Sequence, residues 1–193
     1  MKELFEFEHL KKDKSSPKWV VEVEWHDNYR DSVILKQKDC NNGKTIILIM
    51  LNPGRFKNNK DEIYTDSTLR HIRKAFENSG YTLEIFNLFN LSQSSLNNFE
   101  KAPNEIKNDK NPIEGRLEKL TKKGVVALQW GNIKKDYAKN RRDRILLLIK
   151  ELGLREMGLK NQDGSYSHPS HWKPNKIKEF QETILGDINK ALN

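Results

Sequence analysis

The chain has 193 residues, with 35 lysines and arginines against 27 aspartates and glutamates, so its formal net charge is +8 at pH 7. This length suits one domain with a full-sized core, and the basic balance favours an anionic partner, nucleic acid or a nucleotide first. The single cysteine, Cys40, excludes an internal disulfide, a CxxC redox pair and a four-cysteine iron–sulfur cluster.

The basic charge has a second interpretation. Lysine outnumbers arginine and asparagine is abundant, which is the residue bias of an AT-rich genome. Residues 1–6 do not form a signal peptide, and no apolar stretch is long enough to span a membrane. We therefore expect a cytoplasmic protein with no membrane partner, and the sequence carries no signal of its oligomeric state.

The first elements in chain order are strands. Residues 19–25 alternate between apolar and charged side chains, which predicts a half-exposed strand. Residues 32–37 could pair with it across a turn at 26–29. The apolar run 45–51 then predicts a buried central strand.

A helix and a further buried strand follow. Residues 66–79 place apolar side chains on one helical face, with Asp66 or Ser67 able to cap the start and Gly80 ending the helix. Residues 81–89 predict a second buried strand. The remaining expected elements are a loop at 92–111, a short helix at 113–123, a buried strand at 124–130, a long helix at 133–152, a weaker strand at 154–159 and a closing helix at 173–192.

Strands that alternate with helices predict an α/β fold, here a three-layer sandwich with a mostly parallel central sheet. We expect residues 1–193 to form one domain. Residues 1–31 would be an N-terminal extension that pairs at the sheet edge, and residues 173–193 would form the closing helix.

The most informative segment is Asn52-Pro53-Gly54, at the end of the central strand. Pro53 fixes its own φ and biases Asn52 towards an extended conformation, so the direction of the Asn52 amide is restricted. Gly54 allows a ligand to approach the backbone closely. Ligands of open α/β sheets bind beyond the carboxyl ends of the strands. The asparagines at or just beyond such ends are Asn52, Asn87, Asn90 and Asn132.

Charged residues flank this predicted site. Asp66 and Arg70 follow the Asn52 turn shortly, so we expect them to face the same cleft. Basic residues also cluster at the start of the long helix, where cations oppose the helix dipole, which predicts contacts with a phosphate backbone; the alternative is a solvated face. The residues that we expect to contact nucleic acid are Lys134, Lys135, Arg141 and Arg142.

His168 and His171 lie three residues apart, but no nearby carboxylate or cysteine pattern completes a metal site. We therefore expect no metal and no cofactor.

Five segments together resemble the bacterial and phage family called Domain of Unknown Function 1643, over residues 32–172. The name assigns no activity. The segments, in order, are Ile49 to Gly54, Asp66 to Arg70, Asn87-Leu88-Phe89, Trp130-Gly131 and Gly164 to Pro169.

The same landmarks are similar to the uracil-DNA glycosylase superfamily. The resemblance implies a glycosylase-like fold in which Asn52 holds the hydrolytic water and Asn87 reads a flipped pyrimidine. His168-Pro169-Ser170 resembles the late motif that supplies an imidazole to the base and binds phosphate. Met50 stands where the first motif has glycine. On this basis the catalytic residues are Asn52 and His168, and the substrate-binding residues are Pro53, Gly54, Asp66, Arg70, Asn87, Asn90 and Ser170.

Three functions remain open on the sequence. The first is hydrolysis of the N-glycosidic bond of a flipped base. The second is binding of nucleic acid or a nucleotide in the same cleft without catalysis. The third is an enzyme of a free nucleoside or another small molecule, with Asn52 and Asp66 lining a closed pocket.

Overall fold

The structure is a computed structural model, which describes residues 2–7, 18–26, 29–39, 42–52, 66–91, 111–120 and 124–192. Its strands are β1 (Lys2–Phe7), β2 (Trp19–His26), β3 (Tyr29–Gln37), β4 (Thr45–Met50), β5 (Thr82–Asn87), β6 (Val125–Leu128) and β7 (Arg155–Met157). Its helices are α2 (Ser67–Ala75), α4 (Ile113–Glu118), α5 (Asp136–Glu151), the short 3₁₀ helix η2 (Pro169–His171), α6 (Pro174–Glu182) and α7 (Ile184–Leu192).

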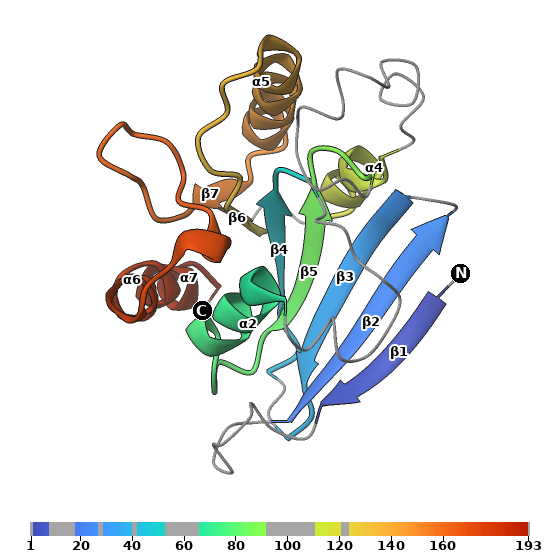
Figure 1. Cartoon of the computed structure of the whole chain (residues 1–193), viewed down its shortest axis with the longest axis vertical. Helices are drawn as coiled ribbons and strands as arrows, with labels where there is room; N and C mark the ends of the chain where they lie inside the picture. The colour runs from blue at the N-terminus through green and yellow to red at the C-terminus, as the bar shows by residue number, and fades with distance from the viewer. Residues whose placement is uncertain are drawn as a thin grey trace.

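The strands form one seven-stranded sheet in the order β1-β2-β3-β5-β4-β6-β7 (Figure 1). The α/β class is confirmed, but the sheet is mixed and not mostly parallel. Strands β5, β4, β6 and β7 pair in parallel, whereas β1, β2, β3 and β5 pair antiparallel. Strands β2 and β3 are close in sequence, and such a short connection joins antiparallel neighbours only. The antiparallel pairing of β3 with β5 joins this half to the parallel half. β1 lies at one edge of the sheet, against β2.

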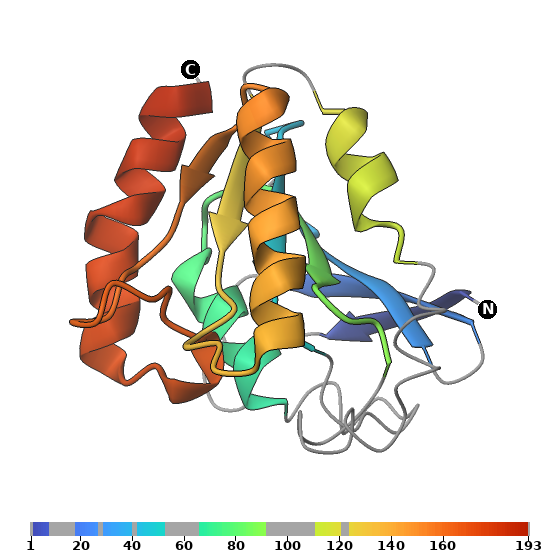
Figure 2. The same ribbon diagram turned by 90° about the horizontal axis from the view of Figure 1, so that it is seen from above.

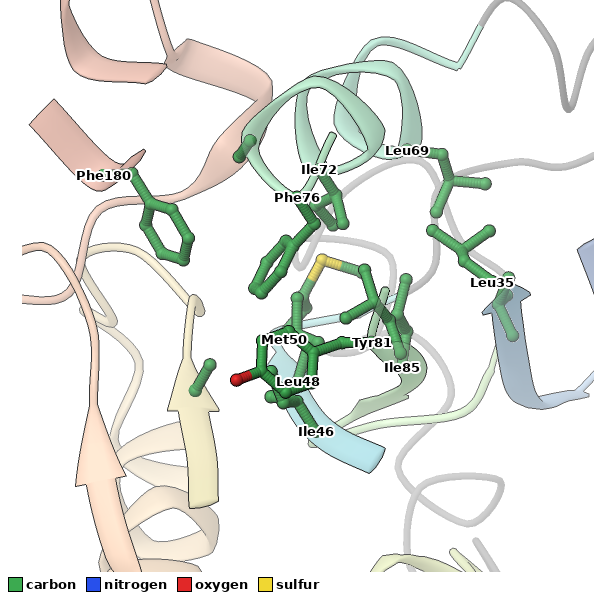
Figure 3. Packing of buried hydrophobic residues seen from close by; sticks show 14 of the residues in the cluster. Leu35, Ile46, Leu48, Met50, Leu69, Ile72, Phe76, Tyr81, Ile85 and Phe180 are labelled. Atoms are coloured by element: carbon green, nitrogen blue, oxygen red, sulfur yellow. The ribbon is translucent and has the colours of Figure 1, made fainter. Parts of the chain in front are cut away.

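Helices cover both faces of the parallel half of the sheet (Figure 1 and Figure 2). Alternate residues of β4 divide between two apolar cores, as the period of two in a strand requires. Ile46, Leu48 and Met50 join the core beneath α2, α6 and α7, and Figure 3 shows them beside Ile72 and Phe76 of α2. Ile47 and Ile49 join the core beneath α4 and α5.

Sequence periodicity located most of these elements, with differences at their ends. The predicted pairing of 19–25 with 32–37 is confirmed by the antiparallel register of β2 and β3. The predicted closing helix at 173–193 is two helices instead, because the chain leaves regular helical geometry at Thr183, where ψ is −71°. None of the helices in the described part of the chain is long and apolar enough to cross a bilayer.

Candidate functional site

The carboxyl ends of β4 and β5 bring two predicted asparagines together. Met50 and Asn87 are register partners in the parallel pair, and Asn52 lies two residues beyond Met50. Asn87 continues the alternation of Leu83 and Ile85, which puts it on the face that α2 covers. The same alternation along β4 assigns Asn52 to this face.

Asn87 has a buried side-chain amide whose hydrogen-bonding groups are unsatisfied by the described residues. Its side chain is 1% exposed, and among the described residues neither Oδ1 nor Nδ2 has a hydrogen-bond partner. Its backbone is held, because the carbonyl accepts a bond from Asn111 Nδ2 at 2.7 Å. An unpaired buried amide destabilises the folded state, so it calls for an explanation in function.

The start of α2 and the short helix η2 close over this end of the sheet. Asp66 is the N-cap of α2, where its Oδ1 accepts a bond from the Leu69 N–H at 2.8 Å. α2 packs against η2 (Figure 1 and Figure 2). His71 Nδ1 lies 2.6 Å from the Pro169 carbonyl oxygen. Of the two capping residues that the sequence allowed, Asp66 and Ser67, the structure uses Asp66.

His168 precedes η2 and lies against the segment after β6. Gly131 adopts a φ of +76°, and a Cβ at that position would lie 3.2 Å from His168 Cβ. The Ser170 N–H donates to His168 Nδ1 at 3.2 Å, and Ser170 Oγ lies 2.8 Å from the same nitrogen. Since a backbone N–H can only donate, Nδ1 is an acceptor and the neutral ring carries its proton on Nε2.

Burial lowers the pKa of His168 to about 4. The neighbouring His171 lowers this pKa further, whereas the Asp66 carboxylate acts in the opposite direction. At neutral pH the ring is therefore uncharged, and its Nε2–H is a neutral hydrogen-bond donor.

This depressed pKa predicts a stability that depends on pH. Between about pH 6.5 and 4 the unfolded chain binds a proton that the folded chain does not. The free energy of unfolding should therefore fall by up to about 3 kcal/mol as the pH drops through this window. Urea unfolding at pH 7, 5.5 and 4.5 measures it. His168→Gln should lose this part of the pH dependence, whereas the exposed His171→Gln should keep most of it; equal slopes for wild type and H168Q would contradict the assignment.

Arg30 is a residue of this site that the sequence analysis did not predict. A β-bulge at Glu24/Trp25 shifts the register of β2 against β3, so that Arg30 pairs opposite Trp25. Trp25 belongs to the core beneath α2, so the bulge turns Arg30 to the same face as Asn87. The Arg30 side chain is 3% exposed. Burial lowers its pKa to about 10, and the Asp66 carboxylate partly offsets this effect.

The other predicted binding residues have different surroundings. Asn90 is buried and structural, because Nδ2 donates to Asp31 Oδ1 at 3.0 Å and its carbonyl accepts from the Arg30 N–H. Arg70 is exposed on α2. Pro53 and Gly54 lie outside the described residues.

The predicted basic surface of α5 is divided by ion pairs. Arg141 forms a two-pronged pair with Glu114 of α4, and its Nε donates to the Leu88 carbonyl at 3.3 Å, so it ties α5 to α4. Arg142 pairs with Asp143. Lys134 is exposed, and Lys135 is the N-cap residue of α5.

A second residue outside the sequence prediction is Gln129, directly after β6. It is fully buried, and neither of its amide atoms has a hydrogen-bond partner in the part of the chain that the structure describes. Asn132, by contrast, is exposed and donates to Asp163 at 2.8 Å. A signal for Gln129 was present in the sequence, as a polar residue inside an otherwise apolar strand segment.

Two cavities bounded by described residues are lined by other side chains than Asn87, Asp66 and His168. One of about 550 Å³ lies between α4 and strands β3 and β5, on the opposite face of the sheet. The other, of about 480 Å³, lies beside α5 and Tyr166. Within the described ranges, no group of three or more histidine, cysteine, aspartate or glutamate side chains is arranged to hold a metal ion.

The fold and site define an α/β protein with a mixed sheet and a polar cluster over the carboxyl ends of its parallel strands. Residues 33–170 match the model of the family described as Protein of unknown function (DUF1643), and the chain belongs to that family. Searches of curated proteins and of solved structures gave no significant match.

Proposed function

We propose that this protein binds a nucleobase over the carboxyl ends of β4 and β5 and hydrolyses the N-glycosidic bond between base and sugar. The main support for the proposal is the Asn87 amide, because it is 1% exposed and both its polar atoms lack a partner among the residues that the structure describes. A primary amide presents a donor beside an acceptor, which complements the hydrogen-bonding edge of a base. Enzymes that act on bases read them by such contacts after extruding them from the stack.

The proposed reaction needs charge stabilisation on both sides of the bond. Water adds to C1′, the C1′–N bond breaks, its electron pair leaves with the base, and the base recovers a proton from the water. The neutral Nε2–H of His168 would donate to the base oxygen on which negative charge develops. Asn52 would aim the water, and the Asp66 carboxylate would oppose the positive charge on the sugar.

A nucleic-acid substrate would also need contacts to its phosphates. Lys134 lies just before α5 and Arg142 lies within it, and this helix follows β6 at the carboxyl end of the sheet. We propose these side chains as phosphate contacts, because Arg142 pairs with its exposed neighbour Asp143, whereas Glu114 and the Leu88 carbonyl hold Arg141 in a half-buried position. Binding through them would weaken steeply as salt rises.

Incubation with oligonucleotides that contain uracil, hypoxanthine or a mismatch tests the proposal, with released base measured by chromatography. We expect base release by wild type and, because one donor to a developing oxyanion is lost, a rate roughly 10²-fold lower for His168→Gln. His171→Gln is the matched control and should retain wild-type activity. Absence of base release from all three substrates would contradict a hydrolase.

One observation favours binding without hydrolysis as a second candidate. Asp66 is the carboxylate that the proposed reaction uses, and its Oδ1 already accepts the capping hydrogen bond from the Leu69 N–H. Asn52 is an amide and a weak base, so neither group readily takes a proton from water. This candidate predicts salt-dependent binding of single-stranded DNA or RNA with no base released.

A further inference from the structure

Gln129 is the second buried amide at this end of the sheet. Its backbone N–H donates to the Ile49 carbonyl at 2.8 Å, so the main chain is paired. The side chain is 0% exposed, and within the described part of the chain neither Oε1 nor Nε2 has a hydrogen-bond partner. Among the buried amide side chains that the structure describes, Asn87 and Gln129 are those in which both polar atoms lack a partner.

The two amides lie in one row across three adjacent strands. Met50 of β4 is the register partner of Asn87, and Ile49 is that of Leu128, which places Gln129 beside Met50 on the other side. Gln129 continues the alternation of Val125 and Ala127, so it shares the α2 face with Asn87. Asn87 and Gln129 therefore flank β4 at the same level.

The two amides are separated by β4. Two strand separations place the backbones of Asn87 and Gln129 about 9.5 Å apart, with Met50 between them. Met50 packs down into the core beside Ile72 and Phe76 (Figure 3), so the ligand would lie beyond Met50, towards Asn52.

We infer that Gln129 is a specificity-determining residue and that the base bound at this site is a purine, read on one edge by Asn87 and on the other by Gln129. A pyrimidine joined to its sugar presents one hydrogen-bonding edge, since C5 and C6 carry no polar group. A purine presents both the Watson–Crick edge and the N7 edge. Two amides on opposite sides of one base therefore favour a purine over a pyrimidine. This inference rests on the proposed function and departs from the pyrimidine that the sequence resemblance implies.

Calorimetric titration with inosine, guanosine, adenosine, uridine and cytidine tests the inference. Gln129→Leu is the main variant, because leucine has a similar volume and no hydrogen-bonding group. Gln129→Met repeats the test with an unbranched side chain in case Q129L does not fold. The control is Gln162→Leu, an exposed position in the 161–165 loop.

We expect wild type to prefer a purine nucleoside and Q129L to bind it at least roughly tenfold more weakly, as the loss of a two-point contact to a base requires. Pyrimidine binding and the melting temperature should not fall. A wild-type preference for pyrimidines, or unchanged purine affinity in both Q129L and Q129M, would overturn the inference and leave the proposed function standing. Absence of both nucleoside binding and base release in wild type would overturn both.

Discussion

Replacing Asn87 by leucine is expected to slow base release by at least ~10²-fold. The bound base would lose its hydrogen bonds to the Asn87 amide, and such bonds contribute strongly to binding of the transition state. The same change is expected to raise the free energy of unfolding of the ligand-free protein by about 1–2 kcal/mol. The reason is that the amide is 1% exposed and has no hydrogen-bond partner within the described ranges, so an apolar group of similar shape removes its desolvation penalty. Single-turnover base release and urea unfolding measure the two effects.

Two comparison variants sharpen this test. Asn87→Asp keeps the shape but buries a carboxylate, so it should lower both the activity and the free energy of unfolding. Asn140→Leu, at an exposed position of α5, should leave both close to wild type. An Asn87→Leu protein that is less stable than wild type and fully active would show that the amide is structural.

The largest loss of stability is expected from Gly158→Ala. A Cβ at this position would lie 2.5 Å from the Leu128 carbonyl oxygen and 2.8 Å from Cδ1 of the Tyr166 ring. Real Cβ atoms do not approach backbone oxygen so closely, so the segment after β7 must move away from β6. We expect a decrease of roughly 3 kcal/mol in the free energy of unfolding, the upper end for overpacking in a closely packed interior.

Gly115→Ala makes the same chemical change in open surroundings. No described residue outside the helix backbone and the two chain neighbours lies within 4 Å of the Cβ position at Gly115, which is inside α4. Alanine should stabilise this helix by roughly 0.5–1 kcal/mol. Urea unfolding of both variants checks the pair, and a Gly158→Ala protein as stable as Gly115→Ala would refute the close approach. Since Leu128 precedes Gln129, Gly158→Ala should also weaken nucleoside binding.

The sequence was most informative where a local pattern is sufficient. The alternation in 19–25 predicts a strand with one buried face, and β2 buries Trp19, Val21, Val23 and Trp25. The helix at 66–79 was predicted with its cap, although the described helix ends at Ala75 and its C-cap residue is Phe76. The carboxyl ends of buried strands likewise indicated Asn52 and Asn87.

Features that depend on distant partners could not be read from the sequence. The basic run on α5 was interpreted as a phosphate-binding surface, but Arg141 is held by Glu114, 27 residues earlier. The mixed sheet follows from pairing β3 with β5, and hydrophobic patterning does not specify the direction of pairing. Arg30 reaches the site through a bulge, and bulges have no periodic signature.

The order of the strands in the sheet also constrains how this chain can fold during synthesis. β4 lies between β5 and β6, and both of these strands come later in the sequence. The β2–β3 hairpin can form as soon as it leaves the ribosome, but the free edge of β3 can pair only after β5 is made. The central strand β4 is paired on both edges only after residue 128 is made. Until then the apolar strand 45–50 has unpaired edges, which makes this segment the main aggregation risk of the nascent chain.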